Sequence, residues 1–140
     1  MADTLTKSMH VEVISPDGAI FSQDDVDMVV ARAEDGEFAI QKGHLPLAAA
    51  LEMCVVRIKK GAEETRVAVF GGFLENAHNQ VNVVAPLAEM ADSIDVARAE
   101  AAKKRAETRL ASQDDSVDMD RARYALMRAI NRLNATRKSI

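Results

Sequence analysis

The chain has 140 residues, a formal net charge of −4, 4% aromatic residues, one cysteine and no tryptophan. A single cysteine excludes an internal disulfide and a cysteine-rich zinc site, and so few aromatic residues leave little for stacking nucleic-acid bases. We therefore expect no nucleic-acid binding. The apolar runs are far shorter than the ~20 residues that a membrane-spanning helix requires, so we also expect no direct membrane insertion.

Charge and composition both change near residue 93. Residues 1–93 carry 7 basic and 15 acidic residues, a net of −8, whereas residues 94–140 carry 11 basic and 7 acidic residues, a net of +4. All glycines and prolines lie in the first part, and the second part is rich in Ala, Arg and Leu. The contrast predicts an all-β module followed by an all-α module. The charge difference indicates either different partners for the two parts or simply helices with exposed basic faces.

Short β-branched and apolar runs recur between turn signals in the first part. Predicted strands cover residues 10–15, 28–31, 38–40, 47–51, 55–60, 65–70, 73–75 and 81–85. We expect Asp24, Asp25 and Asp27 to lie in a solvated turn. Gly71 and Gly72 are expected to break the strand pattern. Eight to ten short strands in this length predict a β-sandwich or a barrel.

The rear part predicts two amphipathic helices joined by a polar connector. Asp92 or Ser93 is expected to cap the first helix, with Asp95 in its first turn. Ser116 or Asp118 is expected to cap the second. The expected apolar stripes are Ile94, Ala102, Ala106 and Leu110 on the first helix and Ala122, Ala125, Leu126, Ala129, Ile130 and Leu133 on the second. Because alanine buries little area, this antiparallel hairpin should be marginal by itself and is a candidate moving part.

Motifs for catalysis are scarce in the sequence. Neither G-x-x-x-x-G-K-[ST] nor G-x-G-x-x-G occurs, so no glycine-rich phosphate loop is expected. His10, His44 and His78 lack the spacing of a helical zinc site, and we assign them to the surface or to packing. Cys54 is expected to be a small buried apolar residue. No metal site is predicted.

Four arginines of the rear part are spaced so that they share helix faces. Arg98 and Arg105 are seven residues apart, and Arg128 and Arg132 are four apart. In a hairpin both pairs could converge on one multiply charged anion, because guanidinium groups suit phosphate oxygens. The alternative is a solvated basic face.

Four segments, in their order and spacing, resemble the epsilon subunit of bacterial F-type ATP synthases. They are Ala33-Glu34-Asp35-Gly36-Glu37-Phe38, Gly43-His44-Leu45-Pro46-Leu47, Gly71-Gly72-Phe73-Leu74-Glu75 and Ile94-Asp95-Val96-Ala97-Arg98-Ala99. The resemblance covers about residues 9–137. It implies an α+β fold with an N-terminal antiparallel β-sandwich over residues 1–91 and a C-terminal antiparallel two-helix hairpin over residues 92–140.

The resemblance also implies a coupling and regulatory subunit with no catalysis of its own. Its sandwich would bind the gamma subunit of the central stalk and the ring of c subunits, and would couple proton-driven rotation to ATP synthesis at the cytoplasmic face of the bacterial cell membrane. Its hairpin would extend into the catalytic alpha/beta head and inhibit ATP hydrolysis. ATP, as a regulatory ligand rather than a required cofactor, would bind the folded hairpin and favour the non-inhibitory state.

Individual residues follow from the same resemblance. Glu37 and His44 would lie in a loop over residues 37–44 that faces the c ring. The implied ATP-binding residues are Glu89, Ile94, Asp95, Arg98, Ala99, Arg105, Arg128 and Arg132. Two alternatives stay open: a purely structural coupling subunit with a permanently closed hairpin and no nucleotide binding, and an enzyme that uses Glu37 and His44 as an acid/base pair.

Overall fold

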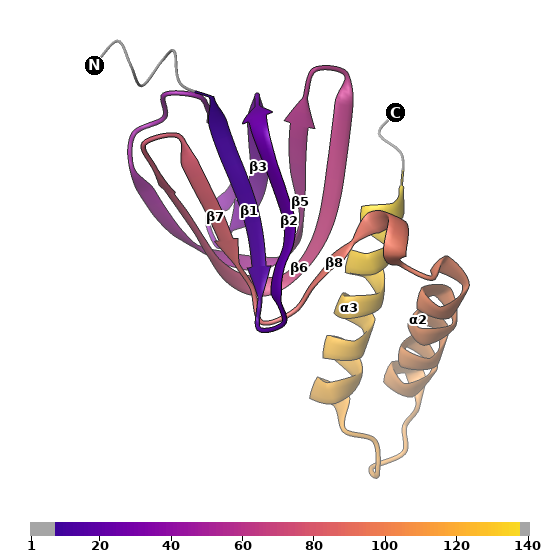
Figure 1. Cartoon of the computed structure of the whole chain (residues 1–140). Helices are drawn as coiled ribbons and strands as arrows, with labels where there is room; N and C mark the ends of the chain where they lie inside the picture. The colour runs from indigo at the N-terminus through magenta and orange to yellow at the C-terminus, as the bar shows by residue number, and fades with distance from the viewer. Residues whose placement is uncertain (1–7, 138–140) are drawn as a thin grey trace.

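Figure 1 shows a computed structural model of the chain, which describes residues 8–137. The elements in chain order are β1 (Met9–Ser15), β2 (Gly18–Val26), β3 (Met28–Ala33), β4 (Gly36–Gln41), β5 (Leu47–Lys60), β6 (Glu63–Ala77), β7 (Gln80–Val84), β8 (Ala88–Met90), the 3₁₀ turn η1 (Ala91–Ser93), α2 (Val96–Ala111) and α3 (Met119–Thr136). The strands form one body and the two helices a hairpin beside it, so the predicted α+β architecture is confirmed (Figure 1). Neither helix is long and apolar enough to cross a membrane.

The strands form one continuous hydrogen-bonded sheet that folds over on itself. Its order is β2-β1-β7-β6-β5-β3-β4, and β8 pairs with β6. Every pairing is antiparallel except that of β1 with β7, which run parallel. The predicted antiparallel β-sandwich is thus confirmed, and the parallel pairing of β1 with β7 is a feature that the sequence analysis did not include. The alternation of apolar residues shows which face of a strand is buried, and it does not encode the direction of the neighbouring strand.

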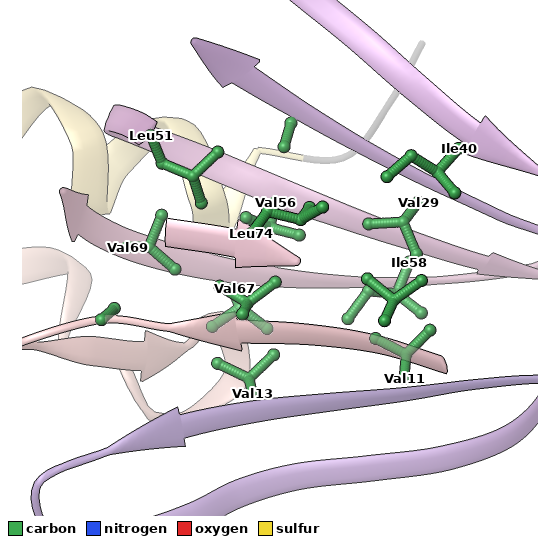
Figure 2. Close-up of a cluster of buried hydrophobic side chains, with 14 of the residues drawn as sticks. Val11, Val13, Val29, Ile40, Leu51, Val56, Ile58, Val67, Val69 and Leu74 are labelled. Atoms are coloured by element: carbon green, nitrogen blue, oxygen red, sulfur yellow. The ribbon is translucent and has the colours of Figure 1, made fainter. Parts of the chain in front are cut away.

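The core lies between the two layers and consists mainly of branched aliphatic side chains. Val13 of β1 points toward Val67 and Val11 points toward Ile58, on the side opposite Val29 and Ile40 (Figure 2). The large, fully buried side chains are Met9, Val11, Val13, Val26, Val29, Ile40, Val56, Ile58, Val67, Val69, Leu74 and Val81. The expected burial of Cys54 is confirmed, and that burial raises the pKa of its thiol.

Two long strands replace four of the predicted short ones. Residues 47–51 and 55–60 both belong to β5, and residues 65–70 and 73–75 both belong to β6. Gly71 and Gly72, expected to break the pattern, lie within β6 with φ values of +82° and +113°. The register of β6 against β5 is the same on both sides of them. A Cβ at Gly72 would lie 2.2 Å from the carbonyl oxygen of Val84, so glycine here permits a close approach of two backbones.

The sequence reasoning missed β2. Asp24 and Asp25, expected in a solvated turn, lie in this strand, and Asp25 has a positive φ of 55° where the register of β1 against β2 shifts. Asp27 lies between β2 and β3 and accepts a hydrogen bond from the Gly61 backbone N–H at 2.7 Å. The strand is polar because it lies at the edge of the sheet, and such a strand carries little of the hydrophobic alternation that marks buried strands.

His10 of β1 contacts one carboxylate on its own strand and one on β2. Its Nε2 lies 3.1 Å from Glu12 Oε1, and its Nδ1 lies 2.6 Å from Asp24 Oδ1. Hydrogen bonds to Glu12 and then to Asp24 raise the pKa of His10 from its ordinary value of 6.5. Because the pKa is higher in the folded state, protonated His10 stabilises the fold. This stabilisation is fully present below the ordinary pKa and is lost as the pH rises through the raised pKa.

The His10→Gln variant should therefore show a weaker pH dependence of stability than the parent. For the parent, we expect the urea concentration at the midpoint of unfolding to fall slightly between pH 6 and pH 8, because His10 deprotonates and its charged hydrogen bonds weaken. Glutamine has no proton to lose in this interval. Equilibrium unfolding in urea at both pH values measures the difference, and an identical pH dependence in the two proteins would show that His10 contributes nothing.

Candidate functional site

The start of α2 lies farther along the chain than the sequence predicted. Asp95 is the N-cap, and its side chain accepts from the Arg98 backbone N–H at 3.0 Å. Asp92 and Ser93, the expected caps, lie in η1 instead. Ile94 has extended dihedrals (φ −82°, ψ 126°), so its backbone separates the 3₁₀ turn from the helix. For α3 one of the two expected caps is confirmed: the Asp118 side chain accepts from the Arg121 N–H.

Alanines form the seam between the two helices. Ala99 and Ala106 of α2 are buried, as are Ala122 and Ala129 of α3. Side chains of this size let the two helix axes approach closely. The predicted stripe is wrong at Ile130, which is 37% exposed. The buried face of α3 instead includes Asn131 and Ala135, because this helix also packs against β5 and β6.

A cleft of about 390 Å³ lies where β8 and η1 meet the two helices. Its lining residues are Glu89, Ser93, Ile94, Asp95, Arg98, Ala99, Ala102, Arg105 and Arg132. The fold thus gathers every residue of the predicted ATP-binding set except Arg128, which is half-buried on α3 and does not line the cleft. Residues more than 40 positions apart in the chain meet here.

Arg132 is held in place by a carboxylate and a ring. Its Nε donates to both carboxylate oxygens of Glu89, at 2.8 and 3.1 Å, and its guanidinium lies over the ring of Phe70, 5.0 Å from the centroid. Such cation–π contact and a charged hydrogen bond both restrict the side chain. Because Glu89 engages Nε, the two terminal nitrogens of Arg132 are available to a further acceptor.

The rest of the cleft favours an anion. Arg98 and Arg105 are exposed and form no ion pair with any residue from 8 to 137. Asp95 is engaged as a helix cap, and the first turn of α2 adds the partial positive charge of a helix N-terminus. Three guanidinium groups thus face two carboxylates that both have partners. This arrangement suits several phosphate oxygens at once.

A larger groove, of about 710 Å³, lies along the outside of the hairpin. Its charged lining, Glu100 and Glu107 beside Lys103, Lys104 and Arg137, has the same formal balance as that of the smaller cleft. Neither glutamate forms an ion pair with residues 8–137, so both carboxylates would repel an anion. The arginines of the smaller cleft do not reach it. The smaller cleft is therefore the better candidate for a charged ligand.

Glu37 and His44 do not share one loop. Most of the expected loop is strand β4, with Glu37 near its start and His44 in the turn that follows its end. At about 3.3 Å per residue, β4 places Glu37 about 13 Å from Gln41, and the Gln41 carbonyl oxygen accepts from the His44 N–H at 3.1 Å. Glu37 pairs with Arg57 at 3.3 Å, and His44 Nδ1 lies 2.6 Å from the Leu45 carbonyl oxygen. They form no acid/base pair here, so the structure does not support the enzyme alternative.

The turn that carries His44 is fixed by two asparagines that sequence reasoning missed. Asn76 donates to the carbonyl oxygens of His44 and Leu45 at 3.3 and 3.1 Å, and Asn79 accepts from the Gly43 N–H at 2.7 Å. Both asparagines are almost completely buried. Among residues 8–137 no cluster of three or more His, Cys, Asp or Glu side chains could hold a metal ion.

Three residues of or beside the cleft were also missed: Phe70, Ser93 and Ala102. Ala102 lies one turn beyond Arg98, so helical spacing could have found it. Phe70 belongs to β6, far from the helices in sequence, and no local signal places it under Arg132.

Comparison with known proteins defines the class of this two-part molecule. Residues 8–91 match the family model of the ATP synthase delta/epsilon chain β-sandwich domain, and residues 92–137 match the model of its long α-helix domain. The chain therefore belongs to the ATP synthase delta/epsilon chain family. Family membership makes it a non-catalytic subunit of an ATP synthase.

Two relatives are about half identical to this chain over the parts that align. The ATP synthase epsilon chain of Priestia megaterium is 50% identical over 106 residues, which are 76% of this chain and 78% of the relative. That of Alkalihalophilus pseudofirmus is 51% identical over 105 residues, 75% of this chain and 78% of the relative. A chain in the Euglena gracilis mitochondrial ATP synthase structure has the same fold, with a TM-score of 0.79, 20% identity, and coverage of 93% of this chain and 82% of that chain.

Proposed function

We propose that the chain couples rotation to ATP synthesis in the central stalk of a proton-driven ATP synthase and regulates ATP hydrolysis through its hairpin. Family membership and the division into a sandwich and a hairpin support this function. The observation that carries the regulatory part is the cleft that Arg98, Arg105 and Arg132 line together. The proposed ligand is ATP, whose phosphates would meet these guanidinium groups.

The cleft exists only while the hairpin is folded against the sandwich. It needs β8 and η1 together with both helices, so ATP would bind the closed form and stabilise it by RT ln(1 + [L]/Kd). About 1–3 kcal/mol of such stabilisation changes which of two closely balanced conformations dominates. The alanine seam favours such a balance, because it buries little apolar area.

When ATP falls, the open hairpin would reach the catalytic alpha/beta head and inhibit hydrolysis. The basic rear part, with a net charge of +4 over residues 94–140, would favour acidic surfaces there. Removal of residues 94–140 is expected to abolish this inhibition, so that the whole enzyme hydrolyses ATP several-fold faster when assayed at low ATP. A permanently closed, purely structural hairpin would predict little change, and that result would remove the regulatory function.

The sandwich would contact the gamma subunit and the c ring from the cytoplasmic side of the cell membrane. A chain in the central stalk and c-ring structure of the Tetrahymena thermophila mitochondrial ATP synthase has a similar fold. Its TM-score is 0.54 at 15% identity, and the match covers 92% of this chain and 96% of that chain. The candidate ring contacts are Glu37 and His44. Because they lie at opposite ends of β4, a ring contact through both would have to extend along that strand.

A further inference from the structure

Asn131 stands out in the interface between α3 and the sandwich. The other buried residues of α3 are alanines, whereas Asn131 is polar and only 6% exposed. Its Nδ2 donates to the Val69 carbonyl oxygen at 3.0 Å and to the Cys54 carbonyl oxygen at 3.2 Å. Cys54 of β5 and Val69 of β6 are directly paired in the sheet. One side-chain amide thus connects the helix to two neighbouring strands.

These two hydrogen bonds select one register of α3 on the sheet. Sliding the helix by one turn would move the amide by ~5.4 Å, away from both carbonyl oxygens. A buried amide without partners is costly, so that register is disfavoured. A single buried asparagine sets the register of coiled-coil helices by the same physics. A leucine at this position would bury equally well in several registers, because apolar burial has no direction.

The register of Asn131 also places the next residue of the helix. Arg132 is rotated by about 100° around the helix from Asn131. In the observed register its guanidinium lies over Phe70, the residue that follows Val69 in β6. Its Nε donates to Glu89 of β8, and β8 pairs with the same stretch of β6. The sandwich positions that hold Asn131 are thus adjacent to those that hold Arg132.

We propose that Asn131 is a positioning residue for the anion cleft: its amide sets the register of α3 on β5 and β6, and that register brings Arg132 into the cleft. The link to nucleotide rests on the proposed function, whereas the placement of α3 does not. Arg66 of β6 also contacts the C-terminal end of the same helix. Its guanidinium donates to the carbonyl oxygens of Asn134 and Arg137, where α3 ends. Such contacts hold the helix end without fixing which side chain enters the cleft.

The test compares Asn131→Leu with the matched variant Asn134→Leu in the full chain. Asn134 is also on α3, is exposed, and its side chain donates no hydrogen bond to residues 8–137. Spin labels are placed in a Cys54→Ala background through Ala62→Cys on the β5–β6 turn and Arg121→Cys near the start of α3. The distance distribution between the labels reports the position of α3, and calorimetric titration with ATP reports the cleft.

Asn131→Leu is expected to broaden the distance distribution and to weaken ATP binding at least about fivefold, because several registers of α3 become similar in free energy. Asn134→Leu should change neither. If Asn131→Leu keeps a single narrow distance, Asn131 only fills space and the proposal is overturned, whatever ATP does. If the parent binds no ATP while the distribution still broadens, the register role stands and the nucleotide function is the part that fails.

Discussion

Replacing Arg98 and Arg105 together by alanine is expected to weaken ATP binding by about 100-fold or more. A hydrogen bond to a charged group contributes about 1.5–3 kcal/mol, so two of them account for at least two orders of magnitude in affinity. Both side chains line the cleft, are exposed, and form no ion pair with residues 8–137. The double variant should therefore fold normally, and calorimetric titration of the full chain with ATP measures the loss.

The matched control is Lys104→Ala with Arg123→Ala. It removes the same net charge from the hairpin, one charge from each helix instead of two from α2, at exposed positions that do not line the cleft. We expect its ATP affinity to change by less than about threefold, since screened surface charges act weakly at a distance. Equal losses in the two double variants would show that net charge attracts the nucleotide and would contradict a specific site. Arg128→Ala should cost less affinity than Arg132→Ala, because Arg128 lies outside the lining.

Gly72→Ala is expected to lower the free energy of unfolding by about 2–6 kcal/mol, the largest stability effect of any substitution considered. Two causes add. The φ of +113° strains any side-chain-bearing residue, and the new Cβ would lie 2.2 Å from Val84 O and 2.8 Å from Ala85 Cα, both of them backbone atoms. Those atoms cannot move without disturbing the pairing of β6 with β7.

Gly18→Ala separates the two causes. Gly18 has the same φ of +113°, and a Cβ there would meet nothing within 4 Å. Its cost should be the strain alone, about 1–3 kcal/mol. Urea unfolding of the two variants beside the parent gives the difference. If Gly18→Ala and Gly72→Ala destabilise equally, the contact with the end of β7 has no energetic weight and only the backbone conformation matters.

Sequence reasoning succeeded where a local pattern corresponds to a local structure. The alternation of Val11 and Val13 located β1, and Asp118 before a helical stripe located the start of α3. It failed where partners come from elsewhere in the chain. The edge strand β2 owes its conformation to pairing with β1, and the parallel pairing of β1 with β7 leaves no mark in either strand.

The candidate site shows the same division. The helical spacing of Arg98 and Arg105 correctly placed both on one face toward a shared cleft. The same reasoning included Arg128 on spacing and resemblance, and the cleft does not reach it. Asn131 and Phe70 could not be found, because their roles depend on how α3 packs on β5 and β6, a contact that no short-range pattern records.

In the proposed mechanism, ATP binds the closed hairpin and thereby stabilises it. The most direct measurement is the population of the closed form as a function of ATP concentration, followed in the full chain by the distance between labels on the β5–β6 turn and on α3. We expect the closed fraction to rise with ATP along a saturating curve and to show no rise in the Arg98→Ala/Arg105→Ala variant. A closed fraction that stays constant up to millimolar ATP would rule out this mechanism and leave a coupling subunit whose hairpin does not sense nucleotide.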